Sequence, residues 1–156
     1  MQFYRRKKHM RKILAVILGA VVGSITLFLV GLIANAIYPT PPELMDPATP
    51  EAVVQRVAST STITWLSTIF GLALGAFLGG VIGARVAIEK IVWVTSAIGL
   101  VLSLWAFYTF YVVFPAVLWV PIGMLISSLL FSYLGGFVVM RSQQKKSAAT
   151  KKLTSS

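Results

Sequence analysis

Four long runs of uncharged, apolar residues constrain this chain more than any other feature of its sequence. They cover residues 13–36, 62–84, 91–113 and 121–140. A helix rises about 1.5 Å per residue, so about 20 residues cross the hydrocarbon core of a bilayer, which is about 30 Å thick. The chain is 57% hydrophobic and only 12% charged, which is not typical of a water-soluble domain. We predict an all-α polytopic membrane protein, a four-transmembrane-helix bundle formed by residues 13–140.

The basic residues predict which side of the membrane each loop occupies. Of the 14 Lys and Arg residues, only Arg56 lies in a segment expected outside. Because cytoplasmic loops carry an excess of Lys and Arg, we predict both termini and the loop 85–90 in the cytoplasm, with the loops 38–61 and 114–120 outside. Anionic headgroups attract basic residues at that face. We expect these side chains to fix the topology and contact lipid headgroups: Arg5, Arg6, Lys7, Lys8, Arg11, Lys12, Arg85, Lys90, Arg141, Lys145 and Lys146.

The first apolar run has a competing interpretation as a signal peptide. It follows the basic tail 1–12 and ends in Ala34-Asn35-Ala36, a small-x-small pattern that resembles a cleavage site. Its length exceeds the apolar region of about 7 to 15 residues found in secretory signals. We therefore expect a retained anchor. Cleavage after Ala36 is the alternative and would leave three spans.

The segments outside the spans have few structural signals. Prolines in the segment 38–42 end the first helix. Thr49 can act as an N-cap, with Pro50 at the first helical position, which predicts a short helix over residues 50–58. That helix is either a connector or a docking surface for a partner. The basic tail 141–156 is expected to be disordered.

Glycines at every fourth position predict that the second run is the centre of the bundle. Gly71, Gly75, Gly79 and Gly83 follow this spacing, with Ser67 before them. Such spacing places small residues along one side of a helix, where another backbone can approach closely. Three interpretations of this stripe remain open: it packs against another helix of the same chain, it packs against an identical chain, or it lines a pore. We also expect these small residues to pack between helices: Gly19, Gly23, Gly80, Ser132, Gly135 and Gly136.

A short motif occurs twice in the chain. Phe77-Leu78-Gly79-Gly80, followed by Arg85, recurs 56 residues later as Tyr133-Leu134-Gly135-Gly136, followed by Arg141. Both copies close helices that are predicted to run from the outside to the cytoplasm. The pattern indicates either a duplicated helical hairpin or a chance similarity between apolar helices.

The spans lack the residues that chemistry at membrane depth requires. No Asp, Glu, Lys, Arg or His falls within the four runs, whereas an ionisable group at that depth is the usual mark of proton coupling or ion passage. The chain has no Cys and a single histidine, His9, in the basic tail. We therefore predict no catalytic residue, no cofactor and no metal site. The basic tails are not part of a nucleic-acid-binding fold, so we expect no nucleic acid partner.

The outer loop and the second run resemble small bacterial integral membrane proteins with four helices. The features that carry the resemblance are Tyr38-Pro39-Thr40-Pro41-Pro42, the acidic stretch through Asp46 and Glu51, and the glycine-rich run that follows, roughly residues 38–85. The resemblance transfers no activity and no catalytic residue.

The function expected from these observations is structural. We expect a non-enzymatic protein of the bacterial inner membrane, either an accessory or scaffold subunit or a homo-oligomer held by glycine-mediated packing of the glycine-zipper kind. Its partners would be anionic lipid and either itself or another membrane protein. The alternative is a channel or carrier for a small uncharged or apolar solute, since uncharged spans do not forbid its passage.

Overall fold

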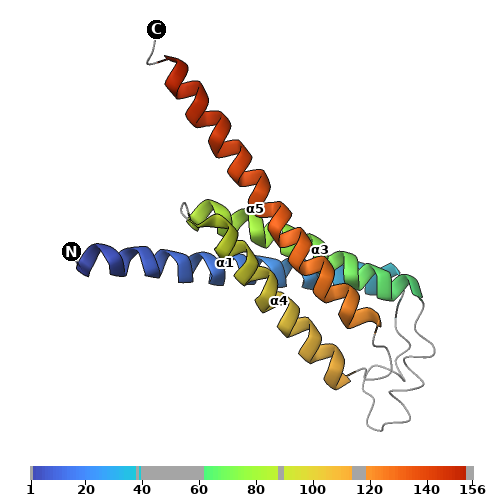
Figure 1. Ribbon diagram of the computed structural model, residues 1–156. Helices are drawn as coiled ribbons and strands as arrows, with labels where there is room; N and C mark the ends of the chain where they lie inside the picture. Colours follow the sequence, from blue (N-terminus) through green and yellow to red (C-terminus); the bar gives the residue numbers. More distant parts are fainter. Residues whose placement is uncertain (1, 38, 40–61, 88–89, 114–118, 154–156) are drawn as a thin grey trace.

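The computed structural model describes residues 2–37, 39, 62–87, 90–113 and 119–153. This part of the chain forms four α-helices and no strand (Figure 1). Each helix contains a stretch that is long and apolar enough to cross a membrane, so the prediction of an all-α chain with four such helices is confirmed. The helices are α1 (Gln2–Ile37), α3 (Thr62–Ala87), α4 (Ile91–Val113) and α5 (Trp119–Leu153). The short helix predicted over residues 50–58 lies outside the described residues.

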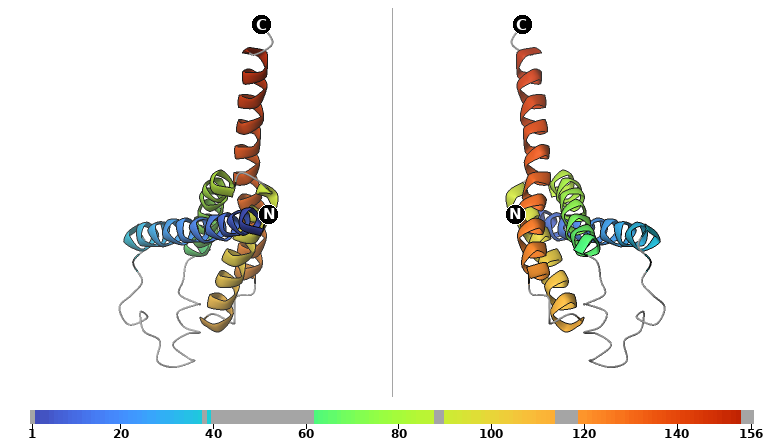
Figure 2. Two further views of the ribbon diagram at one scale, coloured as in Figure 1. Left: turned by 90° about the vertical axis from the view of Figure 1, so that its left-hand side faces the viewer. Right: turned by 90° about the vertical axis from the view of Figure 1, so that its right-hand side faces the viewer.

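The helices form two pairs that cross one another. α1 lies against α3, α4 lies beside α5, and the second pair runs across the first instead of alongside it (Figures 1 and 2). Successive helices alternate in direction. The start of α1, the end of α3, the start of α4 and the end of α5 therefore lie towards the same side of the molecule (Figure 1).

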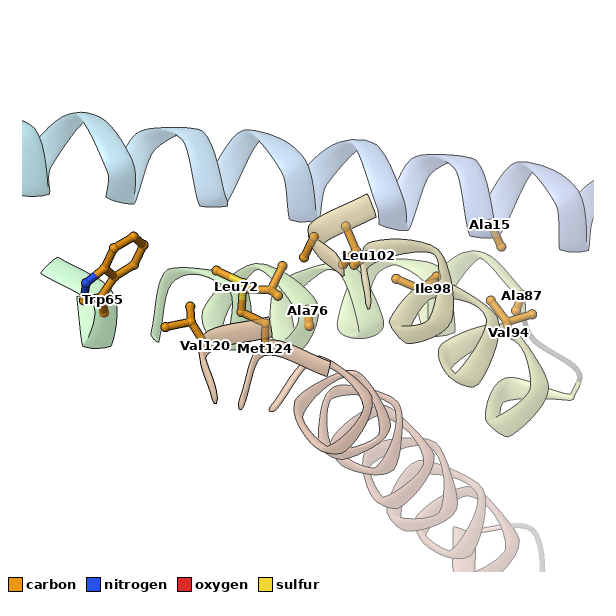
Figure 3. Packing of buried hydrophobic residues seen from close by; sticks show 11 residues of the cluster. Ala15, Trp65, Leu72, Ala76, Ala87, Val94, Ile98, Leu102, Val120 and Met124 are labelled. Carbon is orange, nitrogen blue, oxygen red and sulfur yellow. The ribbon is translucent and has the colours of Figure 1, made fainter. Parts of the chain in front are cut away.

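α3 is the central helix, as its glycine spacing predicts. Both α3 and α4 pack against each of the other three helices, but the contacts of α3 are the most extensive. Nine of its eleven buried residues are Gly or Ala, so its neighbours lie close to its backbone. Larger side chains fill the space where α4 and α5 cross α3 and α1 (Figure 3). Leu72 from α3, Ile98 and Leu102 from α4, and Met124 from α5 are almost fully buried there.

The C-terminal segment differs from the sequence-based expectation. We expected residues 141–156 to be disordered, but α5 continues as a helix to Leu153. The segment 141–153 contains no Gly or Pro, and Arg, Gln, Lys and Ala are good helix formers. The end of α5 projects beyond the other helices (Figures 1 and 2). In the same way, α1 begins at Gln2 and includes the basic N-terminal segment.

Lys90 marks the beginning of α4. Its φ of 53° places it in the left-handed region, which non-glycine residues seldom occupy. Its carbonyl oxygen accepts a hydrogen bond from the Val94 N–H at 3.2 Å. Lys90 thus provides the first helical hydrogen bond of α4 while it turns the chain.

Candidate functional site

The backbones of α1 and α3 approach each other at glycines. A Cβ atom at Gly75 would lie 2.5 Å from the carbonyl oxygen of Gly23, and a Cβ at Gly23 would lie 3.1 Å from the carbonyl oxygen of Gly75. Gly19 and Gly79 face each other in the same reciprocal way, with the Gly79 oxygen 2.8 Å from a Cβ at Gly19. A side chain at these positions would collide with the main chain of the neighbouring helix. We call this contact the α1–α3 seam.

The α1–α3 seam continues in both directions along α3. Towards the end of α3, a Cβ at Gly83 would lie 3.1 Å from the carbonyl oxygen of Ala15. Towards its beginning, a Cβ at Gly71 would lie 2.9 Å from Cγ1 of Val30. Ser67 extends the spacing in the sequence, but its hydroxyl donates to the carbonyl of Thr64 at 2.8 Å within α3. The four glycines of the predicted stripe therefore all face α1.

Gly80 turns to a different neighbour. It lies about 100° around the helix from Gly79, and a Cβ there would collide with the carbonyl oxygen of Ser132 in α5. In return, Gly135 of α5 lies against the carbonyl of Phe77, and a Cβ at Gly135 would lie 3.0 Å from the Val81 nitrogen. The two copies of the repeated sequence motif thus pack directly against each other.

The contact between α4 and α5 is built from buried hydroxyl groups. The Ser132 hydroxyl donates to the Thr95 carbonyl at 2.6 Å, and the Ser103 and Ser128 hydroxyl oxygens lie 2.5 Å apart in a hydrogen bond. All four residues are buried. Every buried side-chain nitrogen or oxygen in the described part of the chain has a hydrogen-bond partner. These hydroxyls therefore join the two helices and leave no unsatisfied polar group within the contact.

Two glycines complete this α4–α5 seam. Gly136 faces Thr95, whose Cγ2 atom would lie 2.5 Å from a Cβ at the glycine. Gly99 faces α5, where a Cβ would lie 3.2 Å from the carbonyl oxygen of Ser128. Both positions admit no larger side chain without a shift of their neighbours.

Sequence reasoning selected Ser132 and Gly136 from this seam as helix-packing residues, and it expected Thr95, Ser103 and Ser128 to form hydrogen bonds with backbone carbonyls or with a neighbouring helix. It did not single out Gly99 or the spacing along α4. A signal was present, because the small residues recur at every fourth position on both helices: Thr95, Gly99 and Ser103 on α4, and Ser128, Ser132 and Gly136 on α5. This matches the spacing that drew attention to α3. The mixture of Ser, Thr and Gly is less conspicuous than an all-glycine stripe.

The basic residues lie near those helix ends that share one side of the molecule. Arg85 is in the last turn of α3 and Lys90 precedes α4. Arg141 follows the apolar part of α5, and its guanidinium lies 4.9 Å from the centroid of the Phe137 ring, within the range of a cation–π contact. Lys145 and Lys146 are exposed further along α5, while Arg11 and Lys12 lie near the start of α1. The side chains of Arg5, Arg6, Lys7 and Lys8 are outside the described ones.

Metal-binding groups do not gather among the residues that the structure describes. No three His, Cys, Asp or Glu side chains lie together there, and all four acidic residues fall in undescribed segments. Comparison with protein-family models, curated proteins and solved structures finds no match to this chain. The small and polar side chains that the structure describes pack the helices together.

Proposed function

We propose that this chain is a non-enzymatic integral membrane protein of the bacterial inner membrane that acts as an accessory or scaffold subunit. The observation that supports this function most directly is that the surfaces formed by small residues pack against other helices of the same chain. The glycine stripe of α3 faces α1, and Gly80 and Gly135 join α3 to α5. The buried hydroxyls likewise join α4 to α5. The polar and small residues of the interior thus hold one unit together.

The outer surface of this unit is apolar and carries large side chains. On α4, Trp93, Leu100, Leu104 and Tyr108 are exposed along one side of the helix, and lipid or a neighbouring helix would cover them. Because the glycine stripes face inward, an assembly would use such large side chains for contact. This arrangement favours association with another membrane protein or a second copy through the outer faces, in place of glycine-mediated association between chains.

An intact-mass measurement of the chain purified in mild detergent tests the proposal. A scaffold or accessory subunit is expected to be retained in an assembly heavier than the 16.9 kDa chain. A mass at a multiple of 16.9 kDa would identify a homo-oligomer, and any other larger mass would identify a different partner. A monomer that carries no second protein, in detergents that preserve its thermal transition, would contradict the proposal.

The packing between α3 and α5 argues against the alternative function of a carrier or channel. A path for a small uncharged solute between these helices would need space where Gly80 meets the Ser132 carbonyl and Gly135 meets the Phe77 carbonyl. The main chains are in contact there. We expect vesicles containing the purified chain to release a panel of small neutral solutes no faster than empty vesicles.

A further inference from the structure

A groove of about 380 Å³ lies between the last turns of α3 and the part of α5 that leaves the apolar core. It begins just beyond the close contact of Gly80 with α5. Its apolar lining consists of Val81, Val138 and Val139, and its polar lining consists of Arg85, Ser142, Gln143 and Lys146. The groove therefore has a hydrocarbon part and a part rich in cations and hydrogen-bond donors.

The two parts of the groove follow the order of groups in a phospholipid. Val81 and Val138 lie nearer the centre of their apolar runs, while Arg85 and Lys146 follow where those runs have ended. Guanidinium and ammonium groups are strong partners of phosphate oxygens. Basic pockets between membrane helices at this level bind anionic lipid headgroups.

We propose that this groove binds a single anionic phospholipid. Its phosphate lies at Arg85 and Lys146, its remaining headgroup oxygens meet Ser142 and Gln143, and the adjoining acyl chain lies along the valines. A free phosphate ion would use only the polar lining, whereas the valines supply contact for hydrocarbon. The site requires that the chain is in a membrane, but it does not depend on the proposed scaffold role.

The groove is held by contacts that do not involve the lipid. α3 and α5 are joined at Gly80 and Gly135 on one side of it. α5 continues as an unbroken helix through Ser142 and Lys146, which fixes the spacing of its polar lining. Little ordering of the backbone is needed for binding, so a measurable preference among lipids is expected.

Lipid titration of the full chain in neutral detergent tests this site. We expect native mass spectrometry to show one tightly retained phosphatidylglycerol, and weaker retention of phosphatidylcholine with the same acyl chains. The double variant Arg85→Gln with Lys146→Gln should bind phosphatidylglycerol roughly 25-fold more weakly, about fivefold for each basic residue. The matched control is Lys151→Gln with Lys152→Gln, which removes the same charge from the far end of α5, beyond the groove, and should leave this binding within about twofold of wild type.

Three results would overturn the proposal. Equal loss in the two double variants would mean that only the total surface charge matters. Equal retention of the two lipids by the wild-type chain would remove the need for an anionic headgroup, and this comparison involves no variant that could misfold. Competition by millimolar inorganic phosphate as effective as that by phosphatidylglycerol would show a site for a free anion.

Discussion

Gly79 and Gly31 show that the same residue has opposite roles in this molecule. Both lie within long apolar helices. A Cβ at Gly79 would collide with the carbonyl oxygen of Gly19, whereas a Cβ at Gly31 would meet nothing within 4 Å. Lipid is as apolar as a leucine side chain, so helices in a membrane associate mainly through close packing and hydrogen bonds. Only the first glycine provides such packing.

The first prediction compares alanine at these two sites. Gly79→Ala should lower the free energy of unfolding by about 1 to 3 kcal/mol, because the added methyl group forces the α1 and α3 backbones apart. Gly31→Ala should be neutral or raise stability by up to about 1 kcal/mol, since alanine favours the helix. Thermal unfolding in one detergent measures both. Equal effects of the two substitutions would show that the α1–α3 seam does not depend on glycine.

A second prediction concerns Ser132 in the α4–α5 seam. Ser132→Ala removes the buried 2.6 Å hydrogen bond to the Thr95 carbonyl, and should cost about 0.6 kcal/mol and at most about 1.7 kcal/mol. Ser127→Ala is the control, because the Ser127 hydroxyl donates only to Met124 within α5, at 3.1 Å. Reversible unfolding in mixed micelles gives both values. A larger loss for Ser127→Ala would contradict the role of the interhelical bond.

At the scale of helices, spacing along the sequence could predict which surfaces pack but not against which partner. The glycines from Gly71 to Gly83 recur at every fourth residue. This spacing predicted a central α3, because residues four apart share one side of a helix. The crossing of the two helix pairs determines these partners: Gly75 meets Gly23, and Gly80 meets Ser132. This crossing is set by many contacts at once, so no local pattern contains it.

The end of α5 differs from the sequence-based expectation. The basic tail after the last span was expected to be disordered. The residues after Arg141 nevertheless continue the helix to Leu153. Their helix propensity is high and no Gly or Pro interrupts them. The apolar part of α5 provides the initial turns, so the costly nucleation step is not repeated.

A third prediction follows from this continuation. Ala148→Pro should break the end of α5 without changing the thermal midpoint, because this part projects away from the other helices (Figure 1). Leu130→Pro, at another exposed position of the same helix, should cost about 3 kcal/mol or more. Trypsin cleavage at Lys151 and Lys152 should become faster in Ala148→Pro. Equal destabilisation by the two prolines would show that the end of α5 is packed.

At the scale of the whole molecule, the alternating helices and the distribution of charge give one consistent arrangement. The ends of α3 and α5 and the starts of α1 and α4 lie towards one side (Figure 1), and the basic residues follow the same ends. The positive-inside rule predicts that this side faces the cytoplasm. Helix packing alone does not determine which side of the membrane carries these ends, whereas the distribution of basic residues does.

The chain has no cysteine, so single introduced cysteines report topology without a background signal. In intact bacterial cells, a membrane-impermeant maleimide should label cysteine at Thr60 or Ala116, which lie in the loops expected outside. Cysteine at Lys12, Lys90 or Gln144 should be labelled only after the membrane is permeabilised. The positive-inside rule gives the physical reason, since Lys90 and the basic residues around Lys12 and Gln144 are expected to hold these segments on the cytoplasmic side.

The same experiment separates the retained anchor from a cleaved signal peptide. If the first helix is retained, the label at Lys12 stays on the 16.9 kDa chain; cleavage after Ala36 would remove it from that chain. The α1–α3 seam favours retention, because loss of α1 would expose Gly75 and Gly79, whose backbones are covered by Gly23 and Gly19. Labelling at Lys90 in intact cells would reverse the orientation. Loss of the Lys12 label from the folded chain would show that α3 is stable without α1.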